Sequence, residues 1–98
     1  MKPKNMHNCH DAAITRWETI NKDLYIDYKC VDGRIGTFIF YDCSNLHEII
    51  YKLNASLENK CEAYRPEIIG FGNGKHKVVV LDSDIGCLEI HCNSMSET

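Results

Sequence analysis

Histidine and cysteine are the residues of this chain with the most obvious chemistry, and they gather near its two ends. One group is His7, Cys9 and His10, and the other is Cys87, His91 and Cys92. Imidazole and thiolate are ligands that zinc prefers. Neither group has the tightly spaced ligand pairs of a structural zinc site, and His91 and Cys92 are expected on opposite faces of a strand. We therefore predict no metal site, with a mixed site of His7, Cys9, His10 and His91 as the alternative.

Acid–base and nucleophilic catalysis draw on the same residue types. The histidines and lysines that suit RNA cleavage by proton transfer are His10, His47, His76 and His91 with Lys75 and Lys77. Cys43 stands just before an expected helix, where the helix dipole lowers a thiol pKa and favours a nucleophile. The sequence places no two of these groups together, and solvated histidines and structural cysteines are commoner. We predict no catalytic residue and no cofactor.

The segment GFGNGK at 70–75 resembles a phosphate-binding loop. Such a loop ends in Gly-Lys-Ser or Gly-Lys-Thr and leads into a helix whose N-terminus faces the phosphates. Here His76 follows Lys75, and a β-branched run comes next. The segment is typical of a hairpin turn at Asn73-Gly74, so we predict no nucleotide site.

Acidic and aromatic side chains are the better candidates for contacts with another protein. Acidic residues stand in two expected turns and on the last strand, and aromatic residues dominate binding hot spots. The partner-binding residues that we predict are Asp82, Asp84, Asp32, Glu89 and Trp17. Further aromatic candidates are Tyr25, Tyr41, Tyr51 and Tyr64. The alternatives are solvated turn chemistry for the acidic residues and core packing for the aromatic ones.

One amphipathic helix is expected over about 45–60. Its apolar residues recur at helical spacing and are Leu46, Ile49, Ile50, Leu53 and Leu57. Ser44 is the expected N-cap, and Pro66 blocks any continuation. The apolar stripe must pack on the sheet that the flanking strands form.

Most of the remaining chain has the pattern of an antiparallel sheet. We predict a hairpin over 24–41 with Asp32-Gly33 as its turn, a second hairpin over 67–81, and a last strand over 87–92. Residues 12–20 fit either a short helix or a strand, with a slight preference for a strand. The fold class is then α+β in the order (β)ββαβββ, with about five or six strands and one helix on a face.

Length and composition indicate one domain over residues 1–98, with 1–10 and 93–98 as loose ends. The net charge of −3 disfavours nucleic-acid binding and favours a basic protein partner. The first residues contain no apolar run, and no stretch has the length of a transmembrane helix. We therefore expect a cytoplasmic protein, off the membrane, whose six cysteines are reduced.

In size, mild acidity and domain type, the whole chain resembles the small bacterial immunity proteins of toxin systems, including contact-dependent growth inhibition. The resemblance implies a non-enzymatic inhibitor that binds a cognate basic toxin, such as a nuclease, and occludes its active site. The alternatives are a phage-encoded inhibitor of a host defence complex, a small His-dependent RNA hydrolase, and a homo-oligomer paired through an edge strand. The partner, the binding face, the oligomeric state and the strand order stay open.

Overall fold

Alternating apolar and polar residues form strands through most of the part of the chain that the computed structural model describes, which is 12–58, 67–73, 77–83 and 86–98. In chain order the elements are β1 (Ala12–Ile20), β2 (Asp23–Lys29), β3 (Ile35–Tyr41), α1 (Leu46–Glu58), β4 (Glu67–Asn73), β5 (Val78–Ser83), β6 (Gly86–His91) and β7 (Ser94–Glu97). The α+β class, the antiparallel pairing and the single central helix are confirmed for the described residues.

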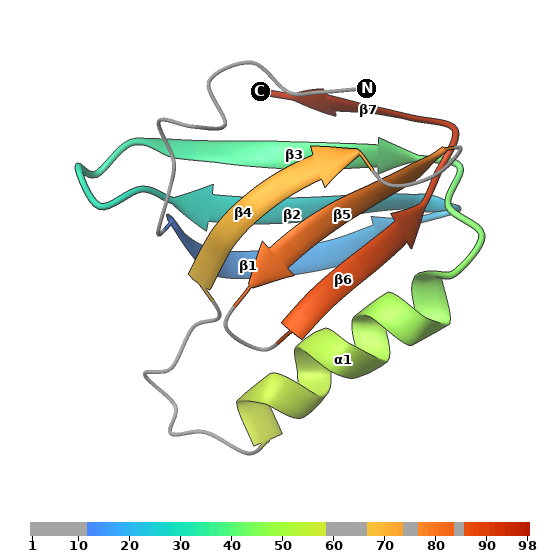
Figure 1. The fold of residues 1–98 in the computed structure, drawn as a ribbon, viewed down its shortest axis with the longest axis horizontal. Helices are drawn as coiled ribbons and strands as arrows, with labels where there is room; N and C mark the ends of the chain where they lie inside the picture. The colour runs from blue at the N-terminus through green and yellow to red at the C-terminus, as the bar shows by residue number, and fades with distance from the viewer. Residues whose placement is uncertain (1–11, 59–66, 74–76, 84–85) are drawn as a thin grey trace.

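The described strands form one sheet in the order β6-β5-β4-β1-β2-β3-β7. Among the described residues, β1 and β4 pair at Ala12–Ile68 and Ala13–Glu67, and the sheet bends at this short junction. Figure 1 shows β4, β5 and β6 crossing in front of β1, β2 and β3, with α1 running beside β6. The inner faces of the two parts enclose the core, and Ile49 and Leu53 of α1 are fully buried in it.

Residues 12–20 form a strand, as the slight preference predicted. A bulge between Ile14 and Arg16 interrupts the pairing of β1 with β2. Because a bulge shifts the alternation by one residue, Trp17 lies opposite buried Ile26 instead of on the outer face. The bulge therefore turns the single tryptophan toward the core.

The hairpin predicted over 24–41 is confirmed as β2 and β3. Its inward residues on β2 are buried, and Gly33 in the turn has φ +93°, a conformation that glycine adopts without strain. On β3, Phe38 and Phe40 are buried, whereas Ile35 is 79% exposed. The start of this strand is therefore more exposed than its second half.

The last residues correct the expectation of a loose end at 93–98. They form β7, which pairs with β3 from Phe38–Glu97 to Tyr41–Ser94 and raises the number of described strands to seven. The segment lacks a run of apolar residues, so its own sequence has no strand signal. The exposed edge of β3 supplies the backbone partners instead.

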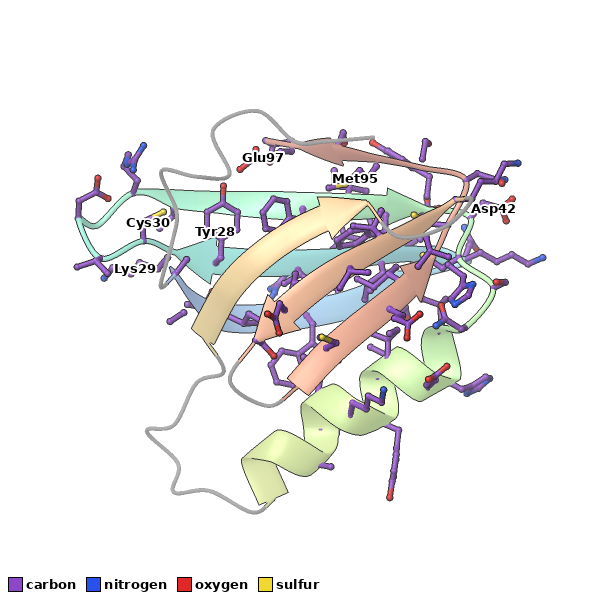
Figure 2. All side chains as sticks on the ribbon, in the orientation of Figure 1. Tyr28, Lys29, Cys30, Asp42, Met95 and Glu97 are labelled. Atoms are coloured by element: carbon purple, nitrogen blue, oxygen red, sulfur yellow. The ribbon has the colours of Figure 1, made fainter. Side chains whose placement is uncertain are left out.

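An aromatic residue holds the C-terminal end of β7. Tyr28 lies opposite Gly36 on β3, and its hydroxyl donates to the Glu97 carboxylate on β7. Figure 2 shows Tyr28 pointing toward Glu97. A Cβ on Gly36 would lie 2.6 Å from Tyr28 Cζ, so the ring occupies the space that any side chain at position 36 would need. We call this set, Tyr28, Gly36 and Glu97, the clasp.

The helix begins one residue later than the predicted cap implies. The Ile49 N–H donates to the Asn45 carbonyl at 3.3 Å, which makes Asn45 the N-cap in place of Ser44. Leu46 and Ile50 pack against the core beside Ile49 and Leu53, which confirms the described part of the apolar stripe. No helix among the described residues combines the length and the apolar character needed to cross a membrane.

Candidate functional site

Two of the predicted partner-binding residues meet on the outer face of the β5–β6 hairpin. Inward positions on β5 and β6 are buried, which leaves Asp82 and Glu89 on the exposed face. Asp82 lies opposite Cys87, and Glu89 lies two residues farther along β6. Such diagonal neighbours are about 7–8 Å apart. The hairpin therefore concentrates negative charge on one small area.

Both carboxylates raise the pKa of the Cys87 thiol. Cys87 Sγ donates to Asp82 Oδ1 at 3.4 Å. This hydrogen bond and the charge of Asp82 raise the pKa of Cys87, with a smaller contribution from Glu89. Negative charge disfavours a second anion, so both shifts have the same sign.

The helix adds a third carboxylate through Asn45. Asn45 Nδ2 donates to the Glu89 carbonyl at 2.7 Å and contacts Glu48 Oε2 at 3.4 Å. Asn45 Oδ1 accepts from the His91 N–H at 3.0 Å. One side chain thus covers part of the β6 edge and brings the first turn of α1 beside Glu89. We call Glu48, Asp82 and Glu89 the acidic patch.

A cation and an aromatic residue flank the acidic patch. Lys52 Nζ lies 3.7 Å from Glu48 Oε1, and both side chains are about half-exposed, so the pair is screened by water. Tyr51 stands three residues after Glu48, on a neighbouring part of the helix surface, and is 68% exposed. The region offers an exposed ring beside carboxylates, a combination that suits contact with a basic protein.

The other predicted partner-binding residues lie elsewhere. Asp32 is in the β2–β3 turn, where Arg34 Nε lies 2.7 Å from its Oδ2. The Arg34 backbone N–H, above other contributions, lowers the pKa of Asp32. Trp17 packs against the core, and its Nε1–H donates to Asn54 Oδ1 at 3.1 Å. These contacts favour the core-packing alternative for Trp17. Asp84 lies outside the described residues.

A pocket of about 330 Å³ opens beside Asn93, at the N-terminal end of β7. Its walls come from the β1–β2 turn, the β3–α1 connection, the start of β5 and the β6–β7 connection. The residues that line it are Lys22, Asp42, Cys43, Ser44, Lys77, His91, Cys92 and Asn93. The pocket thus joins four segments that are far apart in the sequence.

Polar contacts hold these segments together. Lys77 Nζ donates to Asn93 Oδ1 at 3.3 Å, and Asn93 Nδ2 donates to the Asp42 carboxylate. Asp42 and Lys77 have φ values of +52° and +61°, which place both in the left-handed region that few side chains favour. Sequence reasoning missed this pocket, because the signal for it lies in backbone angles and not in residue types.

Cys43 does not have the reactivity that its place before the helix suggested. It is 4% exposed, and its Sγ donates to the Phe40 carbonyl at 3.3 Å. Burial, helped by the neighbouring thiol of Cys92, raises the pKa of Cys43 to about 12. Desolvation outweighs the helix dipole here, which corrects the nucleophile hypothesis and favours the structural reading.

The histidines of the catalytic and metal hypotheses are not brought together among the described residues. His91 is exposed at the pocket, and His47 is exposed on the first turn of α1. His7, Cys9, His10 and His76 lie outside the described residues. Within the described ranges, no three His, Cys, Asp or Glu side chains are placed to hold one metal ion.

Comparisons of the chain with protein-family models, with curated proteins and with solved structures gave no match. The resemblance to immunity proteins therefore stays a prediction.

Proposed function

We propose that this protein is a small non-enzymatic inhibitor, an immunity-type protein of bacterial cytoplasm that binds a cognate basic toxin and occludes its active site. The observation that carries the proposal is the acidic patch with Tyr51 at its side. The net charge of −3 also favours a positively charged partner.

In the proposed mechanism, the inhibitor takes the place of the toxin's substrate in the active site. A nuclease binds the phosphates of its substrate with Lys and Arg. The carboxylates of Asp82 and Glu89 occupy those positions in the complex, and their charges accelerate association by electrostatic steering. Tyr51 then fills an adjoining part of the cleft, where a buried aromatic ring adds most to affinity.

The first test is a tagged pull-down from cells that carry the native locus, followed by mass spectrometry. The informative variant is the double substitution Asp82→Lys and Glu89→Lys, which reverses the charge on the β5–β6 face. Asp32→Lys is the control for location, because it makes one such carboxylate-to-lysine reversal on an exposed turn outside the patch.

We expect the wild type and the Asp32→Lys control to retain one stoichiometric basic partner. The double variant should bind it at least about 100-fold more weakly, and added salt should reduce the difference. Circular dichroism checks that both variants are folded. Absence of a basic partner at low salt, or equal binding by the double variant and the wild type, would overturn the proposal.

A phage-encoded inhibitor of a host defence complex would use the same surface. The identity of the captured partner and of the neighbouring genes separates these two inhibitor functions.

The pocket supports a second candidate, the His-dependent RNA hydrolase. His91 lies there with Lys22 and Lys77, a proton-transfer group beside two cations that suit a phosphate. RNA cleavage by the purified chain, lost in His91→Ala and retained in His47→Ala, would favour this candidate over the inhibitor.

A further inference from the structure

Two buried thiols from distant parts of the chain form part of the same pocket wall. Cys43 follows β3 and Cys92 follows β6, and they are 4% and 3% exposed. Both belong to the single buried core cluster, and both line the pocket. Both cysteines therefore stand at the boundary between the core and the pocket.

Backbone hydrogen bonds place the two cysteines opposite each other. The Ser44 N–H donates to the His91 carbonyl at 2.9 Å, and the Asn93 N–H donates to the Tyr41 carbonyl at 2.9 Å. In an antiparallel pairing, opposite residues alternate between pairs that are hydrogen-bonded to each other and pairs that are not. If Ser44 and His91 form a hydrogen-bonded pair, Cys43 and Cys92 are the next pair and lie opposite each other without a bond between their backbones. The second bond is displaced by one residue, at Asp42, where φ is positive.

The spacing expected of such a pair suits a disulfide. Cα atoms of such a non-hydrogen-bonded pair are about 4.5 Å apart, and disulfides span Cα separations of about 4.4–6.8 Å. The Cys43 N–H donates to the Lys22 carbonyl at 2.7 Å, and the Cys92 N–H donates to the Lys77 carbonyl at 3.0 Å. Both amides therefore bond away from the other cysteine, and both side chains are buried. Cys92 also contributes to the raised pKa of Cys43, as a neighbouring thiol does.

We propose that Cys43 and Cys92 are an oxidative modification site, at which a low-molecular-weight disulfide such as oxidised glutathione converts the two thiols into one intramolecular disulfide. One protein thiol loses its proton and attacks the reagent, which forms a mixed disulfide and releases one small thiol. The second protein thiolate attacks the protein sulfur of that mixed disulfide and releases the other small thiol. Two protein thiols are oxidised, and one reagent disulfide is reduced to two thiols that carry the two protons.

The proposal goes beyond inhibition and holds whether or not the acidic patch binds a toxin. The new bond would tie the β3–α1 connection to the end of β6 and close a loop of about 50 residues, which restricts the unfolded chain. Because burial raises the pKa of both thiols, thiolate is scarce in the folded protein and exchange is slow at neutral pH. The rate should rise about tenfold per pH unit below pH 9.

Peptide mapping tests the proposal directly. Trypsin leaves Cys43 in the peptide 35–52 and leaves both Cys87 and Cys92 in the peptide 78–98. The Cys87→Ser variant makes the second peptide unambiguous, because Cys92 is then its one cysteine. The variant is incubated natively with oxidised glutathione at pH 8.5 and, separately, refolded from urea in a mixture of reduced and oxidised glutathione.

The expected product is 35–52 linked to 78–98, with a Tm higher by about 5–10 °C that returns to the starting value after reduction. Cys92→Ala should lose both the link and the rise in Tm, whereas Cys30→Ala should keep both. Separate glutathione adducts on Cys43 and Cys92, links to other cysteines, or free thiols after both treatments would each overturn the proposal.

Discussion

The two ends of β7 are held in different ways. At the C-terminal end, near Glu97, the Tyr28 ring lies across Gly36. At the N-terminal end, near Asn93, polar segments meet around the thiols of Cys43 and Cys92. The clasp depends on close contact: the Tyr28 and Phe38 rings stack with centroids 4.7 Å apart, and Thr37 and Thr98 exchange backbone hydrogen bonds of 3.2 and 2.9 Å. The pocket depends on several separate hydrogen bonds between exposed groups.

The difference shows how one short edge strand can be fixed in two ways. The clasp excludes any side chain at position 36, so a single methyl group is enough to disturb it. The pocket spreads its contacts over four segments, so the loss of one contact leaves the others in place. We therefore expect point substitutions to cost more stability at the clasp than at the pocket.

The substitution Gly36→Ala tests the clasp most severely. The new Cβ would lie 2.6 Å from Tyr28 Cζ and 3.0 Å from the Thr98 carbonyl, so the ring must move and lose its bond to Glu97. We expect a loss of about 2–4 kcal/mol in the free energy of unfolding, measured by urea denaturation. The control is Gly72→Ala on β4, where a Cβ meets nothing within 4 Å and stability should change by less than about 1 kcal/mol. Equal effects of the two variants would contradict the steric role of Gly36.

The substitution Tyr28→Phe removes the hydroxyl and keeps the ring over Gly36. We expect a loss of about 1–2 kcal/mol, because the part-buried Glu97 carboxylate loses a hydrogen-bond donor. Tyr41→Phe is the matched control, since it removes a more ordinary bond of 2.9 Å between the Tyr41 and Ser96 hydroxyls. Its cost should be below about 1 kcal/mol in the same urea experiment. A larger loss for Tyr41→Phe would reverse the proposed importance of the two ends.

Alkaline pH probes the thiols at the N-terminal end of β7. The pKa of Cys43 is about 12 in the folded chain against an ordinary value of 9.0, so below pH 9 the thiol is neutral in both states and its stabilising contribution is complete. Between pH 9 and 12 the unfolded chain alone loses the proton, and stability falls. From pH 8 to 10 we expect the wild type to lose on the order of 1 kcal/mol more than Cys43→Ala, measured by urea denaturation under reducing conditions. Parallel pH profiles would show that Cys43 is not protected by the fold.

The smallest expected effect concerns the left-handed backbone at Lys77. Lys77→Gly removes the steric cost of φ +61° but also loses the exposed bond to Asn93, so stability should stay within about 1 kcal/mol. Lys77→Val should be less stable than Lys77→Gly by about 1–2 kcal/mol, because a β-branched residue tolerates positive φ poorly. Thermal unfolding followed by circular dichroism compares the two, and equal Tm values would show that the pocket backbone relaxes freely.

Local signals were enough to predict most of the elements. The alternation of Leu24, Ile26 and Tyr28 predicts the inner face of β2, and all three are buried. Asp32-Gly33 predicts the turn between β2 and β3, and the spacing of Ile49 and Leu53 predicts the face of α1. These signals depend on residues within a few positions of one another, and the periods of strands and helices express them directly.

The candidate site was predictable only in part. The acidic side chains of Asp82 and Glu89 belong to one hairpin, so their shared face follows from strand alternation. The third carboxylate, Glu48, joins them through Asn45, a long-range contact with no local signal. The inward direction of Trp17 depends on a bulge that the sequence does not mark.

The sequence alone determined the α+β class, the two main hairpins and the mildly acidic character, because periodicity, turn residues and charge are local or additive properties. Tertiary structure alone decided the place of β7, the clasp, the pocket and the approach of Cys43 to Cys92. Each of these includes a contact between groups more than 40 residues apart, such as Phe38 with Glu97, Tyr28 with Glu97, Asp42 with Asn93, and Ser44 with His91. Such contacts form only when the sheet bends between β1 and β4 and brings its two parts around one core.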